Sequence, residues 1–414
     1  MRYAIIGAGP SGVVAAETLR ARDAQAEIVI VGGEAEPAYS RMAIPYLLAG
    51  QIDETGTYLR HTPDHFDKLG IRMVQEQVST VDTDARRLLL SNGSSLDFDR
   101  LLIASGSHPV KPPVAGLDQP AIHHCWTLAD ARHIAKYASP DSRVVLMGAG
   151  FIGSIIMEAL VRRKVRLTLV EKADRMVPRM MDQTAGNLIK QWCIGQGVDV
   201  RTSTQVDAIE TDPSGSARYL LRTTPSGVIP ADLVVVATGV RPTIGFLQGG
   251  AIETRLGVLV DDHLQTSVEG IYAAGDVCEG FDWNTGARAI HAIQPVAAET
   301  GRLAALNMSG CRTVYTGSLG MNVLDSIGLI STSFGQWQGI DGGDQTQLLD
   351  ESGYRYIKLQ FEEDRLIGAI TLGTTEHVGV IRGLIQSRTQ LGAWRQRLIR
   401  DPSRVMEAYL ANTQ

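Results

Sequence analysis

Apolar runs and glycine-rich turns follow the same order twice in the first half of the chain. Apolar runs at residues 3–6 and 144–147 each precede a glycine-rich turn. Each turn leads into a stretch with the apolar spacing of a helix, at 13–20 and 155–163. This repetition predicts two strand, turn and helix units of the same kind within one chain.

Both turns have the spacing G-x-G-x-x-G. Their glycines are Gly7, Gly9 and Gly12 in the first turn, and Gly148, Gly150 and Gly153 in the second. The first glycine permits a tight turn, the second lets a pyrophosphate approach the backbone, and the third lets helix and strand pack closely. Pro10, Ser11, Phe151 and Ile152 stand where the helices begin, and free N–H groups there favour phosphate. The shared context favours two nucleotide sites over two structural turns.

A second apolar run follows each predicted helix and leads to an acidic residue. The run at 28–31 precedes Glu34, and the run at 167–170 ends next to Glu171. An acid about 20 residues beyond the glycines commonly accepts hydrogen bonds from ribose hydroxyls. Both units therefore complete the pattern of a dinucleotide-binding fold.

Three further apolar runs end in small residues, at 101–106, 234–239 and 271–276. We predict that these strand ends face bound nucleotides. The candidate residues are Ala104, Gly106, Gly239, Gly275 and Asp276. An aspartate in this position can hold ribityl hydroxyls.

The fold class is predicted to be α/β, with two Rossmann-like domains and a C-terminal α+β domain. Prolines and glycines after the paired strand ends indicate chain crossings. The expected domains are a discontinuous first domain at 1–112 and 241–312, a second domain at 113–240 and a third at 313–414. Alternating runs at 354–361 and 366–372, followed by an arginine-containing helical tail, distinguish the third domain.

Composition narrows the function classes. The 414 residues include 39 Lys and Arg against 45 Asp and Glu, and the formal net charge of -6 argues against nucleic-acid binding. No apolar run approaches the roughly 18 residues that span a bilayer, and the glycine turn at residue 7 leaves no room for a signal peptide, so we expect a cytoplasmic protein. The widely spaced cysteines predict reduced structural thiols and no metal site. They are Cys125, Cys193, Cys278 and Cys311.

With the motif Ala-Ala-Gly-Asp after both fingerprints, the sequence resembles the two-dinucleotide flavoproteins related to glutathione reductase. The resemblance covers nearly the whole chain. Within that family it is most similar to the branch of rubredoxin and ferredoxin reductases, the nitrite reductase flavoprotein, NADH oxidases and coenzyme A disulfide reductases. The stretch 39–41 (Tyr-Ser-Arg), followed by 47–50 (Leu-Leu-Ala-Gly), is similar to the nitrite and rubredoxin reductase groups in particular.

The resemblance implies FAD in the first unit and NADH in the second. Glu34 and the first glycines would bind the ADP half of FAD, Arg41 would lie near the pyrophosphate, and Asp276 would hold the ribityl phosphate region. Gln294 and Pro295 would begin a helix whose positive end faces the flavin pyrimidine. NADH is favoured over NADPH because a carboxylate at Glu171 repels a 2′-phosphate, although Lys172 and Arg175 stand nearby.

The chain also departs from the family pattern. It has no cysteine in its first hundred residues, and Met42 stands near the position of the single reactive cysteine of the NADH oxidases. The Glu and Lys pair that ferredoxin reductases place beside the nicotinamide is replaced by Ile155 and Tyr46. Without this pair, we expect the docking of the nicotinamide, the rate of flavin reduction, or both, to differ from those of the ferredoxin reductases.

By resemblance, the reaction is hydride transfer from nicotinamide to flavin, followed by electron transfer to a ferredoxin or rubredoxin. It requires no acid or base from the protein. A reductase of a small oxidant such as a quinone, and an NADH-responsive switch resembling apoptosis-inducing factor, remain as alternatives. The arginine-rich tail could dock an acidic carrier or simply form a solvated helix face, and His291 could donate a proton near the flavin or be structural. The C-terminal domain makes a homodimer plausible.

Overall fold

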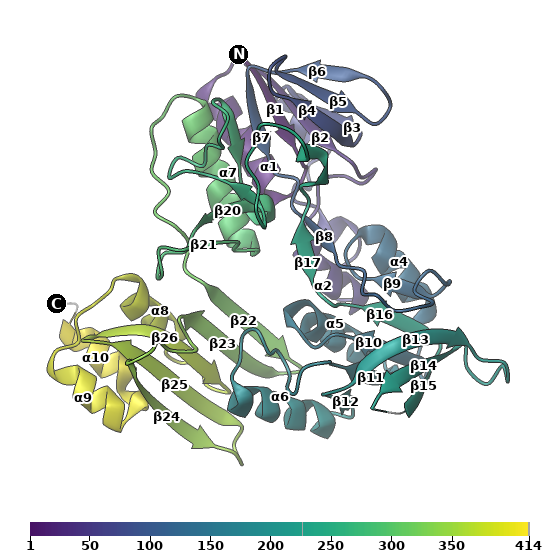
Figure 1. Ribbon diagram of the computed structural model, residues 1–414, viewed down its shortest axis with the longest axis vertical. Helices are drawn as coiled ribbons and strands as arrows, with labels where there is room; N and C mark the ends of the chain where they lie inside the picture. The colour runs from purple at the N-terminus through teal and green to yellow at the C-terminus, as the bar shows by residue number, and fades with distance from the viewer. Residues whose placement is uncertain (226, 413–414) are drawn as a thin grey trace. The chain divides into compact units, whose positions relative to one another are not determined.

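The computed structural model describes residues 1–225 and 227–412, which fold into two compact units (Figure 1). The first unit comprises residues 1–47, 52–108 and 240–318. The second comprises residues 48–51, 109–239 and 319–412. Residues 319–412 thus belong to the same compact unit as the second glycine turn. The three-domain division with ends at residues 112, 240 and 312 stays a proposal.

A five-stranded parallel sheet forms the centre of the first unit, in the order β19-β7-β1-β2-β3. Its strands are β1 (Arg2–Ile6), β2 (Glu27–Gly32), β3 (Ile71–Gln75), β7 (Arg100–Ile103) and β19 (Ile271–Ala273). The central strands β1, β2 and β7 are buried along nearly their whole length. This burial explains why their sequences are continuous apolar runs rather than alternating ones.

Two helices, α1 (Pro10–Arg22) and α7 (Gln294–Met308), lie side by side in this unit. A Cβ at Gly301 would lie 2.3 Å from the carbonyl oxygen of Ser11, so the absence of a side chain permits this contact. Helix α7 begins at Gln294 as predicted. Helix α1 begins at Pro10, earlier than the predicted residue 13, because proline suits the first helical turn.

The first unit also contains short elements, two of which, α2 and β8, have their last residues in the second unit. The short helices are η1 (Arg41–Ala43), α2 (Ile44–Leu48), η2 (Thr55–Thr57), α3 (His65–Lys68), η3 (Gly245–Leu247) and η4 (Gly275–Val277). The short strands are β4 (Val78–Asp82), β5 (Arg87–Leu90), β6 (Ser95–Asp97), β8 (Ser107–Pro109), β17 (Val240–Pro242), β18 (Val258–Leu259), β20 (Cys278–Phe281) and β21 (Arg288–Ala289).

The second unit repeats the parallel arrangement, in the order β12-β11-β10-β16-β9. Its strands are β9 (Ile122–His124), β10 (Arg143–Met147), β11 (Arg166–Val170), β12 (Asp199–Arg201) and β16 (Leu233–Val236). Its helices are α4 (Leu128–Tyr137), α5 (Phe151–Arg162) and α6 (Gln183–Gly195), and its antiparallel strands are β13 (Gln205–Thr211), β14 (Tyr219–Thr224) and β15 (Gly227–Ala231). The predicted duplication of the glycine-turn unit is therefore present in the fold.

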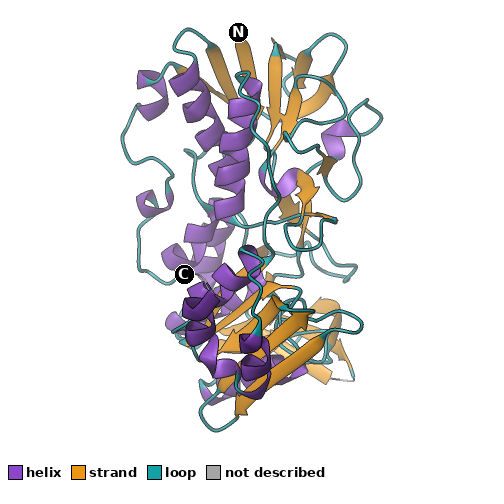
Figure 2. Ribbon diagram, turned by 90° about the vertical axis from the view of Figure 1, so that its left-hand side faces the viewer, coloured by secondary structure: helices purple, strands orange, loops and turns teal. Residues whose placement is uncertain are grey.

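The C-terminal part of this unit is an antiparallel sheet in the order β22-β23-β26-β25-β24. Its strands are β22 (Met321–Ser326), β23 (Leu329–Gly335), β24 (Asp344–Asp350), β25 (Arg355–Glu362) and β26 (Arg365–Leu372). Its helices, gathered beside the sheet in Figure 2, are α8 (Val378–Gln386), α9 (Ala393–Arg400), η5 (Pro402–Arg404) and α10 (Val405–Asn412). The predicted tail is thus divided, because Gly392 has a φ of 53° before α9 and Pro402 opens a separate turn.

Side-chain contacts connect this sheet to the nucleotide part of the same unit. The carboxylate of Asp182 accepts hydrogen bonds from the Tyr356 hydroxyl at 2.8 Å and the Lys358 ammonium at 3.1 Å. The Trp192 indole donates to the carbonyl oxygen of Ile327 at 3.1 Å. Within the described residues, no helix combines the length and apolar character needed to cross a membrane.

Candidate functional site

The three glycines of the first turn have three different steric roles. Gly7 has a φ of 113°, and a Cβ there would lie 2.1 Å from the carbonyl oxygen of Ala104. A Cβ at Gly12 would lie 1.9 Å from the carbonyl oxygen of Gly7. Gly9, in contrast, faces open space. The turn and the packing require glycine at two positions, while the third leaves the backbone accessible at the start of α1.

The second turn repeats this geometry at the start of α5. Gly148 has a φ of 103°, and a Cβ there would lie 2.5 Å from the carbonyl oxygen of Ala237. A Cβ at Gly153 would lie 2.0 Å from the carbonyl oxygen of Gly148, whereas Gly150 faces open space. Phe151 and Ile152 form the first turn of the helix. Two accessible backbone segments, one in each unit, therefore fit the approach of a pyrophosphate.

The acid that follows β2 is held by two neighbouring side chains. Glu34 accepts a hydrogen bond from the Tyr39 hydroxyl at 2.6 Å and pairs with Arg41 at 2.5 Å. Arg41 also donates to the Tyr39 hydroxyl at 2.9 Å. The structure thus brings together two predicted site residues, Glu34 and Arg41. The sequence analysis missed the contribution of Tyr39, whose only signal was its place in the Tyr-Ser-Arg motif.

The corresponding acid of the second unit is fixed by backbone donors. Glu171 accepts hydrogen bonds from the N–H of Ala149, inside the glycine turn, at 2.7 Å and from the N–H of Ala173 at 2.8 Å. The nearby Arg175 donates to the carbonyl oxygens of Met181 and Pro178 and pairs with Asp174. The guanidinium of Arg175 is therefore already engaged by residues close to it in the sequence.

Asp276, after β19, lies in a largely enclosed setting. The Ser107 hydroxyl donates to its carboxylate at 2.8 Å. Burial raises the pKa of Asp276, and the Ser107 hydrogen bond and the charge of Arg41 oppose that rise. The preceding Gly275 has a φ of 75° and donates its N–H to the Thr300 hydroxyl of α7 at 3.0 Å. Sequence reasoning found the aspartate but had no signal for Ser107 or Thr300.

The start of α7 contacts the same region of the first unit. The Ser40 hydroxyl donates to the side-chain oxygen of Gln294, and Pro295 follows in the first helical turn. The hydroxyl oxygen of Ser11, in α1, is buried and has no hydrogen-bond partner among the described residues. A buried polar atom without a partner needs a water or a ligand. The donors at the starts of α1 and α7 therefore suit an anionic, hydrogen-bonding cofactor.

Other predicted positions stand apart from these clusters or have structural partners. Gly106 and Gly239 have φ values of 67° and 114° and face open space. His291 lies 3.3 Å from the carboxylate of Asp282, at ion-pair distance. Burial alone would raise the pKa of Asp282, but His291 and hydrogen bonds from Thr285 lower it to about 2. The sequence analysis missed this pairing across the loop.

The replaced family positions and the cysteines have distinct environments. The side chains of Met42 and Tyr46 are exposed, and Ile155 is partly buried in α5. Burial raises the pKa values of the thiols of three cysteines to about 12, which leaves little thiolate at neutral pH. They are Cys125, Cys193 and Cys278. No metal-binding group of three or more residues occurs in the described part of the chain.

Comparisons with known proteins agree with this geometry. The NADH-dependent phenylglyoxylate dehydrogenase subunit epsilon of Aromatoleum evansii is 30% identical over 418 aligned positions, covering 100% of this chain and 98% of the relative. Putidaredoxin reductase of Pseudomonas putida is 30% identical over 67% of this chain and 66% of its own length. The structure of the covalent putidaredoxin reductase and putidaredoxin complex has a TM-score of 0.90 at 24% identity, covering 100% of this chain and 99% of that one.

Two family models match successive parts of the chain. Residues 321–389 match the rubredoxin NAD+ reductase C-terminal domain, and residues 1–296 match pyridine nucleotide-disulphide oxidoreductase. The predicted fold class, two Rossmann-like domains with a C-terminal α+β domain, is confirmed. The predicted cofactors, FAD and NADH, are those of the family. The chain therefore belongs to the pyridine nucleotide-disulphide oxidoreductase family and is an FAD-dependent NAD(P)H oxidoreductase.

Proposed function

We propose that this protein transfers electrons between NADH and a small redox protein of the ferredoxin or rubredoxin type. The observation that carries the proposal is the pair of matching dinucleotide turns joined to a C-terminal domain of the rubredoxin reductase kind. A bound flavin would supply the means to take up a hydride from the nicotinamide and to release the two electrons singly. The side chains and backbone of this chain bind and orient the two nucleotides.

The proposed contacts combine the two clusters described above with further predicted positions at strand ends. For FAD they are Gly7, Gly9, Pro10, Ser11, Gly12, Glu34, Arg41, Ala104, Gly106, Gly275, Asp276, Gln294 and Pro295; for NADH they are Gly148, Gly150, Phe151, Ile152, Gly153, Glu171 and Gly239. Backbone N–H groups at the starts of α1 and α5 would bind pyrophosphates. The positive end of α7 would stabilise negative charge on the flavin.

The preference for NADH rests on Glu171 and Arg175. The Glu171 carboxylate, fixed by two N–H groups, would accept hydrogen bonds from ribose hydroxyls and repel a 2′-phosphate. The Arg175 guanidinium would have to leave two carbonyl oxygens and Asp174 to bind that phosphate. Binding of NADPH would therefore break existing hydrogen bonds of Arg175 and bring the 2′-phosphate close to the Glu171 carboxylate, which repels it.

A basic and aromatic surface on α9 and η5 suits an acidic carrier. The guanidinium groups of Arg397 and Arg404 both lie over the indole ring of Trp394, with their central carbons 4.5 and 5.3 Å from its centroid. Arg397 and Arg400 are exposed. Arg404 also pairs with Glu407 at 3.2 Å. Positive charge of this kind raises the association rate with acidic proteins, and the effect weakens with salt.

Anaerobic stopped-flow spectroscopy tests the proposed reaction. The FAD-loaded protein is mixed with NADH or NADPH, and flavin bleaching is followed before a ferredoxin or rubredoxin is added. We expect rapid bleaching with NADH and NADH oxidation that accelerates with one of the carriers. NADH oxidation in air that no iron-sulfur or rubredoxin carrier raises above the oxygen background would refute the proposal. Saturable turnover with a quinone alone would then favour a small oxidant.

Charge-reversal variants test the docking surface separately. Arg397→Glu with Arg400→Glu should slow carrier reduction about tenfold at low salt and leave bleaching by NADH unchanged. Arg222→Glu, in the β13–β15 sheet, is the matched control because Arg222 is also an exposed arginine. Equal effects of both changes would exclude α9 as the docking surface. Bleaching that is slow in the unaltered protein, with a change in mass on NADH addition, would instead favour the switch alternative.

A further inference from the structure

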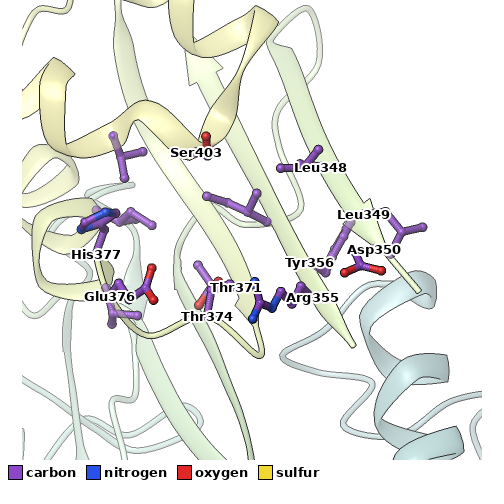
Figure 3. A pocket seen from close by; sticks show the side chains of 14 residues that line it. Leu348, Leu349, Asp350, Arg355, Tyr356, Thr371, Thr374, Glu376, His377 and Ser403 are labelled. Carbon is purple, nitrogen blue, oxygen red and sulfur yellow. The ribbon is translucent and has the colours of Figure 1, made fainter. Parts of the chain in front are cut away.

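A cavity of about 390 Å³ lies within the C-terminal part of the second unit, and its lining includes none of the residues assigned to nucleotides (Figure 3). It is an open cavity bordered by strands β24, β25 and β26 and by the starts of α8 and α10. Its lining residues are Leu348, Leu349, Asp350, Arg355, Tyr356, Ile357, Thr371, Thr374, Glu376, His377, Val378, Ile381, Ser403 and Val405. The volume falls near the lower end of the range for small-molecule sites.

The floor of the cavity follows from strand register. Leu348 pairs with Ile357, and Ile357 pairs with Thr371, so these side chains form one row across three strands. Asp350 pairs with Arg355 in the next row on the same face. The floor of the cavity is thus mainly apolar along the row of Leu348, Ile357 and Thr371, and charged in the neighbouring row of Asp350 and Arg355.

Helices supply an apolar roof. Ile381 of α8 and Val405 of α10 are each only 1% exposed and line the cavity. Leu348, on the edge strand, is 52% exposed although it contacts this apolar interior. The adjacent Leu349 also lines the cavity and is 37% exposed, so apolar surface continues from the interior to the edge strand. The body of an occupant must therefore be apolar.

Charged and polar groups stand at the mouth. Figure 3 shows Glu376 and His377 on one side, Asp350 on the opposite side, and Arg355 and Thr374 between them. Asp350 is engaged by its own turn, since its carboxylate accepts from the Ser352 hydroxyl at 2.8 Å and the Gly353 N–H at 2.9 Å.

Arg355 forms no ion pair within 4.0 Å among the described residues, although its charge helps to lower the pKa of Asp350, its neighbour across the strand pair. Within the same part of the chain, the Nδ1 atom of His377 is buried and has no hydrogen-bond partner. Arg355 therefore offers several uncommitted N–H donors at the mouth, and His377 offers a further polar nitrogen. Glu376 and Asp350 oppose them with two exposed carboxylates.

We propose that this cavity binds a small molecule with an apolar body of about ten to twenty non-hydrogen atoms and one carboxylate head. The body lies on the row of Leu348, Ile357 and Thr371, and the carboxylate accepts hydrogen bonds from Arg355. A planar guanidinium is the side chain best matched to a carboxylate. Glu376 and Asp350 weaken this binding by repulsion, so Arg355 and the two carboxylates have opposite effects on one ligand.

Decanoate and decanol serve as probes, and their binding to the FAD-loaded, full-length protein is measured by isothermal titration calorimetry. We expect decanoate to bind more tightly than decanol. Arg355→Gln should weaken decanoate binding about fivefold, and Glu376→Gln should strengthen it about twofold, with decanol unaffected by either change. Arg72→Gln, at an exposed arginine on β3, is the control and should change neither.

Two variants test the apolar body. Ile357→Trp fills the cavity and should abolish binding of both probes, and the milder Leu348→Gln should weaken both without disturbing buried residues. Flavin bleaching by NADH reports whether each variant remains folded. Undiminished decanoate binding in Ile357→Trp, or the same affinity of Arg355→Gln and the unaltered protein for decanoate, would overturn the proposal. A dimer of the unaltered protein that Leu348→Gln dissociates, without binding of either probe, would identify a second copy as the occupant and also overturn it.

Discussion

A single methyl group added at different glycines of a turn can distinguish the requirements of cofactor binding from those of protein stability. Gly9→Ala and Gly12→Ala each add one Cβ to the same turn, three residues apart. At Gly9 the added atom meets open space, and the backbone, with φ -79° and ψ -176°, is accessible to alanine. At Gly12 the added atom would lie 1.9 Å from a carbonyl oxygen, whereas ordinary contact begins near 3.4 Å.

These distances give opposite expectations for the protein without FAD. Gly12→Ala must move the helix start against β1, and such overpacking costs about 1–3 kcal/mol. For a unit of this size the melting temperature should fall by about 3–10 °C. Gly9→Ala introduces no clash and restricts the unfolded chain, so its stability should be unchanged or higher by about 0.4–1 kcal/mol.

The two substitutions should rank differently in their effect on the affinity for FAD. If the pyrophosphate approaches the backbone at Gly9, one methyl group there blocks contact, and the affinity for FAD should fall at least about tenfold. The assay combines thermal melting of flavin-free protein with titration of FAD by its fluorescence. Gly150→Ala is the matched control, because Gly150 also faces open space and should affect NADH alone. Normal FAD affinity in Gly9→Ala, or lost FAD affinity in Gly150→Ala, would refute the assignment.

Three further outcomes are expected. Asp182→Ala should lower the free energy of unfolding by about 3–5 kcal/mol in denaturant melts, because it leaves the mostly buried Lys358 charge unpaired, and Lys358→Met in the same chain should restore most of that loss. Glu171→Ala should raise the ratio of kcat/KM for NADPH to that for NADH about tenfold, and an unchanged ratio would exclude its role in selecting the nucleotide. The lowered pKa of Asp282 stabilises the fold above its unfolded value near pH 4, so about 2 kcal/mol should be lost as the pH falls from about 4 to about 2; Asp282→Asn should lack this part of the acid dependence.

The duplicated architecture could be predicted because its signals are local. Glycine at positions 7 and 148 reflects a backbone with positive φ, and glycine at 12 and 153 reflects contact with a carbonyl oxygen only five residues earlier. The parallel strands are continuous apolar runs because both faces are buried. Such constraints act within a few residues, so a short stretch of sequence is enough to predict them.

Site details were less accessible to sequence reasoning. The commitment of Arg175 to carbonyl oxygens depends on how its loop folds back, and the spacing of charges alone left it available to a phosphate. The pairing of Asp282 with His291 depends on the loop between β20 and α7. Neither arrangement has a periodic pattern, because a loop conformation is fixed by many weak contacts at once.

The sequence by itself determined two dinucleotide turns, the acids that follow them and the absence of cysteine from the first hundred residues. Tertiary structure alone decided that Asp182 meets Tyr356 and Lys358, and that Leu348, Ile357 and Thr371 form the floor of one cavity. The physical reason is strand register: a shift of one residue would send the floor side chains to the other face of the sheet. Register is set by packing across the whole sheet, so no single stretch of sequence contains it.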